Sequence, residues 1–171
     1  MTTTLVPRAD NVPQKNGHPA GEEGGDRGRH VVVGVDGSEE SKDALRWAAG
    51  QAQLRGGSLD VVTCWQPPVV PYGVWAGYDG GEEARETVDG TVHEVLSVAE
   101  EGDVTVTVVE GDPRLALTEA GKNAELLVVG TRGHGLFAGF LLGSVSRYCV
   151  GHASCPVVVV PHCQRGAGPL K

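Results

Sequence analysis

The chain has 171 residues, of which 40% are hydrophobic and 21% are charged, and its formal net charge at pH 7 is −8. This length is enough to bury a substantial core in one domain. The acidic balance argues against general nucleic-acid binding, which requires a basic surface, and no apolar stretch approaches the roughly 20 residues that cross a bilayer. Because the first residues lack the basic start and apolar core of a secretory signal, we expect a cytoplasmic protein.

The charge is distributed unevenly along the chain. Four of the 14 basic residues and none of the 22 acidic residues follow Glu125, which gives +4 for residues 126–171 and −12 for residues 1–125. A segment without acids is what an anion-binding site requires, although chance in a short apolar segment would give the same pattern.

The chain begins with a segment unlike the rest. Residues 1–29 are rich in Gly, Pro, Asn and charge without an apolar period, which predicts a disordered leader. At His30 the β-branched run "HVVVGVDGS" begins and predicts a strand that is buried on both faces. Ser38 then offers an N-cap for a helix that ends at Gly56 and Gly57.

Strands and helices continue to alternate in the middle of the chain. The run "LDVVTCW" (59–65) predicts a second strand, followed by a loop with prolines and aromatic residues over 66–81. An acidic helix is expected over 82–101. The apolar segments 103–111 and 125–130 predict the third and fourth strands.

The last elements complete the pattern. Asp112 caps a third helix, whose weakest position is Gly121. A fourth helix over 143–153 and the strand "PVVVVP" (156–161) follow. Five strands that alternate with four helices predict a doubly wound α/β sheet, with parallel strands joined by right-handed crossovers and helices on both faces.

The segment "VVGTRGHGLFAGFLLGSVS" (128–146) is rich in glycine. It lacks the Lys and Ser or Thr of a Walker-type loop. Gly133, Gly135 and Ala138 match the dinucleotide fingerprint, but the acid expected about 20 residues further on is missing. A binding site for a mononucleotide fits better. Gly130 and Gly133 can take positive φ, which would turn backbone N–H groups toward a phosphate. The free N–H groups at the start of the following helix would bind the same anion.

The larger spacing of this segment carries a resemblance. Gly130, two residues, Gly133, nine residues, then Gly143 and Ser144 form the pattern G-2x-G-9x-G-[ST]. Together with "VVVGVDGSEESKDALRWA" near the start, this pattern resembles the ATP-binding branch of the universal stress protein family. The resemblance implies a three-layer, Rossmann-like sheet of the adenine nucleotide alpha hydrolase-like type, with five parallel strands in the order 3-2-1-4-5.

The resemblance also divides the chain and implies contacts to a ligand. A universal stress protein domain would span 30–161, between the leader 1–29 and a short tail over 162–171. Gly34 and Asp36 would lie near the ribose and adenine of ATP, bound with or without Mg²⁺, and the second strand around Val62 and Thr63 would contact the base. The phosphates would be surrounded by the remaining candidates: Gly130, Thr131, Arg132, Gly133, His134, Gly135, Gly143, Ser144, Val145 and Ser146.

Structural roles remain open for several of these residues. Asp36 is also a suitable turn or helix cap, Arg132 a solvated loop arginine, and His134 a surface residue. Gly135 is expected to serve the intervening loop. All of these glycines are also compatible with a tight loop that binds no ligand.

Three functions are compatible with these sequence features. The favoured one is a regulatory stress-response module whose nucleotide occupancy modulates dimer or partner contacts. The second is a slow ATPase or nucleotidyl-handling enzyme, for which Asp36 and His134 are the nearby candidate groups. The third is a ligand-free dimeric interaction protein. The resemblance implies a homodimer that pairs through the edge strand 156–160.

The cysteines are expected to be reduced, because nothing indicates export. A zinc site is disfavoured for one group of Cys and His residues, because this group lacks a tight Cys-x-x-Cys pair; its members are Cys149, His152, Cys155, His162 and Cys163. Buried small side chains explain Cys64, Cys149 and Cys155 better, so we expect no metal ligands among them.

Overall fold

A computed structural model of the chain describes residues 2–6, 30–70, 73–74, 79–96, 104–131 and 142–162. The elements along these residues are β1 (Thr2–Val6), β2 (Val31–Gly34), α1 (Glu39–Arg55), β3 (Leu59–Trp65), β4 (Val69–Val70), β5 (Gly73–Val74), α2 (Gly81–Val95), β6 (Val104–Glu110), α3 (Pro113–Ala120), the 3-10 turn η1 (Gly121–Asn123), β7 (Leu126–Gly130), α4 (Ser144–His152) and β8 (Val157–Val160).

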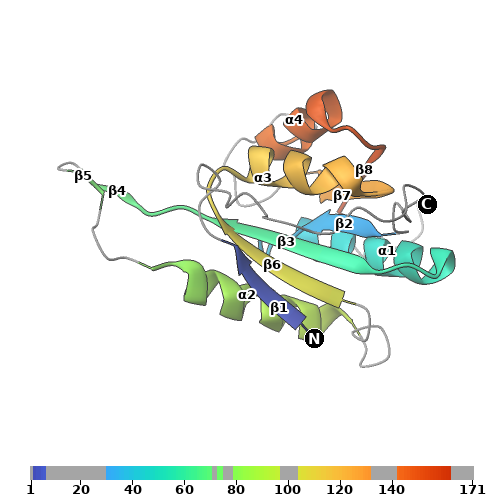
Figure 1. Ribbon diagram of the computed structural model, residues 1–171, viewed down its shortest axis with the longest axis horizontal. Coiled ribbons are helices and arrows are strands. Elements are labelled where there is room, and N and C mark those ends of the chain that lie inside the picture. Colours follow the sequence, from blue (N-terminus) through green and yellow to red (C-terminus); the bar gives the residue numbers. More distant parts are fainter. Residues whose placement is uncertain are drawn as a thin grey trace, which may run out of the picture.

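The main sheet has the order β1-β6-β3-β2-β7-β8, and every neighbouring pair in it is parallel. The five predicted strands therefore lie in the order 3-2-1-4-5, which confirms the doubly wound α/β fold. Helices α1 and α2 cover one face of the sheet and α3 and α4 cover the other (Figure 1). The order reverses between β2 and β7, where the crossovers change from one direction to the other.

The outermost strand, β1, differs from the sequence-based expectation. Residues 2–6 lie in the segment expected to be disordered, yet they form a strand that pairs with residues 105–109 of β6. The segment "TTTLV" has high β-propensity, but it is short and lacks the apolar alternation on which a prediction would rest. The expectation of disorder is corrected for these five residues, and residues 7–29 lie outside the described part of the chain.

Each face of the sheet carries its own hydrophobic core. One core joins alternate valines of β2, Val31 and Val33, to Leu45 on α1 and Val92 on α2. The other core includes Val32 and residues of α3 and α4, and its other buried members are Val62, Leu117, Leu127, Val129 and Cys149. Because β2 contributes to both cores, its continuous apolar run is the pattern of a central parallel strand.

The helix ends follow the predicted signals with two differences. Helix α1 begins after Ser38 and ends at Gly56, whose φ of 61° closes the helix in the left-handed region. Helix α3 stops before Gly121, where a Cβ would lie 3.3 Å from the Cys155 Sγ. Helix α2 ends at Val95, earlier than predicted, because Leu96 is extended. The loop predicted over 66–81 contains the short antiparallel pair β4 and β5.

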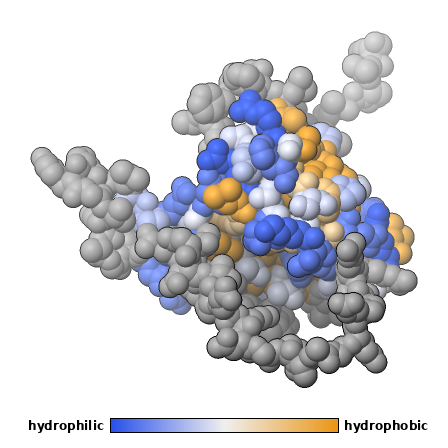
Figure 2. All heavy atoms as spheres, turned by 45° about the horizontal axis from the view of Figure 1, so that its top comes forward, coloured by the Kyte–Doolittle hydropathy of each residue, from blue (hydrophilic) through white to orange (hydrophobic). Residues whose placement is uncertain are grey.

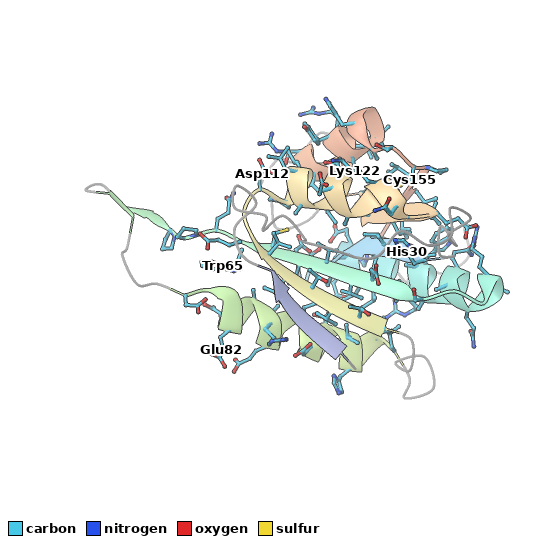
Figure 3. The ribbon with its side chains drawn as sticks, viewed as in Figure 1. His30, Trp65, Glu82, Asp112, Lys122 and Cys155 are labelled. Carbon is cyan, nitrogen blue, oxygen red and sulfur yellow. The ribbon has the colours of Figure 1, made fainter. Side chains whose placement is uncertain are left out.

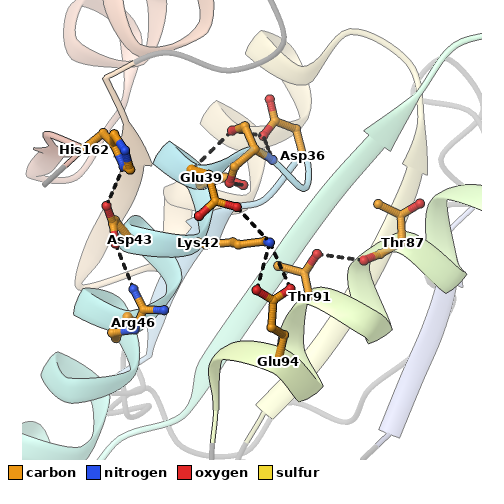
Figure 4. A network of polar contacts seen from close by, with 11 residues as sticks. Asp36, Glu39, Lys42, Asp43, Arg46, Thr87, Thr91, Glu94 and His162 are labelled. Carbon is orange, nitrogen blue, oxygen red and sulfur yellow. Dashed lines mark hydrogen bonds and ion pairs between the residues drawn. The ribbon is translucent and has the colours of Figure 1, made fainter. Parts of the chain in front are cut away.

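Polar contacts hold α1 to its neighbours (Figure 4). The Lys42 ammonium lies 2.9 Å from carboxylates of Glu39 and Glu94, which joins α1 to α2. The His162 ring nitrogen Nδ1 lies 2.9 Å from the Asp43 carboxylate, which joins α1 to the chain after β8. These contacts fix the first half of α1 to α2 and to the chain after β8.

The surface mixes polar and apolar side chains. Figure 2 shows hydrophobic residues among hydrophilic ones on the face turned toward the viewer. Leu115 on α3 and Val150 on α4 are large hydrophobic residues that are 53% and 55% exposed. No helix in the described ranges is both long enough and apolar enough to span a membrane.

Candidate functional site

The carboxyl ends of the parallel strands define one edge of the sheet. Figure 3 shows Trp65 and Asp112 toward this edge and His30 and Cys155 toward the opposite one. In doubly wound sheets, ligands bind beyond the carboxyl ends at the point where the strand order reverses. Here that point lies between the ends of β2 and β7. Gly34 is the last residue of β2 and Asp36 follows it, while Thr131 directly follows β7.

The start of α4 is fastened directly to the end of β7. The Gly143 N–H donates to the Thr131 carbonyl at 2.7 Å, and the Ser146 hydroxyl donates to the same carbonyl at 3.0 Å. The Thr131 N–H donates to the Val160 carbonyl of β8 at 3.0 Å. The structure therefore brings together five of the predicted phosphate contacts: Thr131, Gly143, Ser144, Val145 and Ser146. The other loop candidates lie outside the described residues: Arg132, Gly133, His134 and Gly135.

The N-terminus of α4 differs from those of the other helices. The Ser38 side chain caps α1, the Asp112 carboxylate caps α3, and α2 carries Glu82 and Glu83 in its first turn. Among the α-helices of the described residues, only α4 has neither a side-chain cap nor an acid in its first turn, and its N-cap is Gly143. Its free N–H groups and the positive end of its dipole are therefore available to an anion.

Asp36 has the turn role that its sequence context allows. Its Oδ1 accepts hydrogen bonds from the Ser38 N–H at 3.1 Å and from the Ser38 hydroxyl at 2.5 Å. Gly37 between them has a φ of 84°, which the turn requires. Asp36 itself is exposed at the carboxyl end of β2. Its predicted contact with a ribose stays a prediction.

Gly34 and Gly130 have a packing role that the sequence did not predict. A Cβ on Gly34 would lie 2.9 Å from the Leu117 Cδ1, and a Cβ on Gly130 would lie 2.8 Å from the Glu40 carbonyl oxygen. The described glycines with positive φ are Gly37, Gly56 and Gly111. The interpretation of Gly130 as a positive-φ residue is therefore wrong: it is the last strand residue of β7, and its missing side chain lets α1 approach.

Val62 lies in the middle of the sheet rather than at its rim. Its carbonyl accepts a hydrogen bond from the Val35 N–H at 2.9 Å, and its side chain is buried in the core beneath α3. Thr63, one residue further along β3, is also buried. The backbone of this strand is therefore engaged in the sheet, and the contact of Val62 with a base stays a prediction.

Two further groups at this edge are not among the site residues predicted from the sequence. Asp112 follows β6, and hydrogen bonds from Arg114 hold the pKa of its carboxyl below its usual value. Cys64 is near the end of β3, and burial, followed by the negative charge of Asp112, raises the pKa of its thiol to about 12. Asp112 is thus ionised at neutral pH, whereas Cys64 is a thiol without nucleophilic character. Their position, Cys64 in the last two residues of β3 and Asp112 shortly after β6, at the same edge of the sheet, is the signal that could have identified them.

The described residues contain no group of three or more His, Cys, Asp or Glu side chains arranged to hold a metal ion. Cys163, one member of the disfavoured zinc group, lies outside them. Burial raises the pKa of the Cys149 thiol to about 11, which agrees with its place on the core-facing side of α4.

Comparison with known proteins decides the family. The model of the universal stress protein family matches residues 28–161. The chain belongs to this family. Universal stress protein MT2052 of Mycobacterium tuberculosis (strain CDC 1551 / Oshkosh) is 36% identical over 158 residues, which cover 81% of this chain and 50% of that protein. Universal stress protein Mb2028c of Mycobacterium bovis (strain ATCC BAA-935 / AF2122/97) is 36% identical over 139 residues, with 76% and 47% covered. This universal stress protein thus spans about half the length of these relatives.

Solved structures of the family share the fold. A universal stress protein in complex with cAMP is 29% identical, with a TM-score of 0.57, and the match covers 80% of this chain and 98% of that one. A universal stress protein from Archaeoglobus fulgidus is 26% identical, with a TM-score of 0.59, and the match covers 76% and 96%. The Rossmann-like architecture is therefore common to this chain and to both structures.

Proposed function

We propose that this universal stress protein binds ATP at the edge where β2 and β7 end, with the phosphates at the start of α4. The observation that carries the proposal is the N-terminus of α4, which has a glycine cap and no acid, beside a strand end at the reversal of strand order. The similar structure in complex with cAMP supports an adenine nucleotide as the ligand. The spacing from Gly130 to Ser144 favours ATP within that class.

The residues present fit the chemistry of this ligand. The N–H groups of Ser144, Val145 and Ser146 open α4 and would face the phosphate oxygens, while Arg132 would add a positive charge from the loop. Gly133, His134 and Gly135 would complete the loop around the phosphates. At the end of β2, Gly34 and Asp36 would lie beside the ribose, and Val62 would contact the base. A bound Mg²⁺ would offset phosphate charge and is held mainly by phosphate oxygens and one or two carboxylates.

Binding is a better match to these residues than rapid catalysis. Hydrolysis requires a group that orients water near the γ-phosphate, and the segment after Glu125 contains no carboxylate side chain. Asp36 is already hydrogen-bonded within its own turn. We therefore propose a cytoplasmic regulatory protein of the stress response that hydrolyses ATP slowly if at all.

The proposed regulation includes a homodimer. The edge strand β8 has four valines, each of which is partly exposed, and an apolar open edge favours pairing with another strand. Since the curated relatives have about twice the span of this chain, a second copy would supply the second unit. Sedimentation measures this state: a dimer is expected, and a monomer at all concentrations would contradict it.

The direct test is to extract small molecules from the purified protein and identify any adenine nucleotide. Titration calorimetry with ATP, AMP and cAMP then ranks the ligands, and ATP is expected to bind most tightly. Absence of both extracted nucleotide and ATP binding would overturn the proposal in favour of a ligand-free interaction protein. Turnover that depends on Asp36 would favour the slow ATPase.

A further inference from the structure

The hydroxyl of Ser146 occupies an unusual position between two backbone segments. Ser146 is the third residue of α4 and is only 2% exposed. Its Oγ lies 3.0 Å from the Thr131 carbonyl oxygen, 15 residues earlier in the chain, and 3.1 Å from the Gly143 carbonyl oxygen. The side chain therefore links the end of β7 to the first turn of α4.

The chemistry of a hydroxyl limits what this group can do. A serine hydroxyl has one proton to donate, and both neighbouring backbone groups are carbonyls, which only accept. While these contacts persist, the proton of Ser146 is directed at the protein and not at a phosphate oxygen.

We propose that Ser146 is a positioning residue that holds the end of β7 at Thr131 to the first turn of α4 at Gly143, rather than a phosphate ligand through its hydroxyl. This inference rests on the proposed function only for its effect on ATP. Thr131 receives two donors on its carbonyl, from the Gly143 N–H and from Ser146, and its own N–H bonds to Val160 of β8. Both ends of the loop, residues 131 and 143, are thereby fixed to each other and to the edge strand. A loop that is held in advance loses less entropy when it binds a ligand.

Ser41 in α1 provides a matched control within the same molecule. It is also the third residue of its helix, is 4% exposed, and its hydroxyl donates to the Ser38 carbonyl at 2.8 Å. A hydroxyl bond to a nearby carbonyl is common at such positions. Ser146 differs because it also reaches Thr131 across the loop, and the proposal depends on that contact alone.

The experiment compares Ser146→Ala with Ser41→Ala and Ser144→Ala in the full chain. Amide hydrogen exchange of the peptide over 128–146, measured without nucleotide, should become about tenfold faster in Ser146→Ala and stay unchanged in Ser41→Ala and Ser144→Ala. The Kd for ATP should rise about tenfold in Ser146→Ala. Ser146→Thr retains the hydroxyl and should restore the slow exchange, which separates the effect from general loss of packing.

The outcomes are distinct. Weaker ATP binding with unchanged exchange in Ser146→Ala would make the hydroxyl a direct ligand and overturn the proposal. Exchange that is equally fast in Ser41→Ala would make the effect a general property of serines in first turns and would also overturn it. If the wild-type chain binds no ATP but Ser146→Ala still speeds exchange, the proposed function fails and the positioning role of Ser146 stands.

Discussion

Two strand-to-helix junctions meet at the proposed site, and they are built differently. The β2–α1 junction needs only residues 35–38, and its helix is capped by Ser38 and carries two acids in its first turn. The β7–α4 junction spans residues 131–143, and its helix begins after Gly143 with neither cap nor acid. The first junction satisfies its own helix end, whereas the second leaves that end available to a ligand.

The largest effect is expected when the second junction is made to resemble the first. Gly143 has a φ of −69° and a ψ of 171°, an extended conformation that aspartate adopts easily. Gly143→Asp should therefore cap α4 and stabilise the fold by about 0.3 kcal/mol, since glycine is itself a fair N-cap residue. The same carboxylate would repel phosphate, so ATP affinity should fall about 100-fold or more. Urea unfolding and calorimetry measure the two effects.

Gly143→Asn is the matched control, because asparagine caps a helix without adding charge. It should give a similar gain in stability and a much smaller loss of ATP affinity. ATP binding that survives in Gly143→Asp would show that the phosphates lie elsewhere, and the contrast between the two junctions would lose its functional meaning.

A second prediction concerns the place where the junctions touch. Because a Cβ on Gly130 would meet the backbone carbonyl of Glu40 at 2.8 Å, Gly130→Ala should destabilise the fold by about 2 kcal/mol. Gly34→Ala meets the flexible end of Leu117 and should cost less. Gly50 in α1 has open space around it, so Gly50→Ala should stabilise by about 0.5–1 kcal/mol. Urea unfolding of the three variants measures this order.

The reverse order of the first two variants would contradict the close approach of α1 to β7. A loss of ATP affinity in Gly130→Ala without a loss of stability would instead return this glycine to the role of a direct phosphate contact.

A third prediction removes the cap of the first junction. The Ser38 side chain accepts a hydrogen bond from the Ser41 N–H at 3.3 Å and donates to Asp36. Ser38→Ala should lower the free energy of unfolding by about 1 kcal/mol, while ATP affinity should fall far less than in Gly143→Asp, because α4 is untouched and only the hydroxyl bond to Asp36 is lost. Thermal unfolding with and without ATP measures both quantities. An equal loss of stability and ATP affinity would mean that the two junctions are not separable.

The sequence predicted the sheet well because a central strand leaves a local pattern. The run from Val31 is continuous and apolar, and the segment 59–65 is apolar apart from Asp60 and Thr63. The strands observed there match the predicted ones almost residue for residue. The roles of the glycines were harder to predict because they depend on distant neighbours. Gly130 packs on Glu40, 90 positions earlier in the chain, and Ser146 bonds to Thr131 across a loop. A motif names the residues at a site but does not distinguish packing from ligand contact.

The smallest expected effect concerns α3, the other helix with a side-chain cap, at the same edge. The bonds from Arg114 lower the pKa of the Asp112 carboxyl in the folded state. A lowered folded-state pKa stabilises the fold above the unfolded pKa of about 4, and this stability is lost as the pH falls through the folded-state value. Asp112 is close to solvent, so the charge contribution should be less than about 1 kcal/mol. In urea unfolding, the stability difference between wild type and Asp112→Asn should therefore shrink from pH 7 to pH 3. Because asparagine retains the cap of α3, a difference that is constant with pH would mean that Arg114 does not lower the pKa of Asp112 in the folded state, and it would leave no stabilising charge on this side of the site.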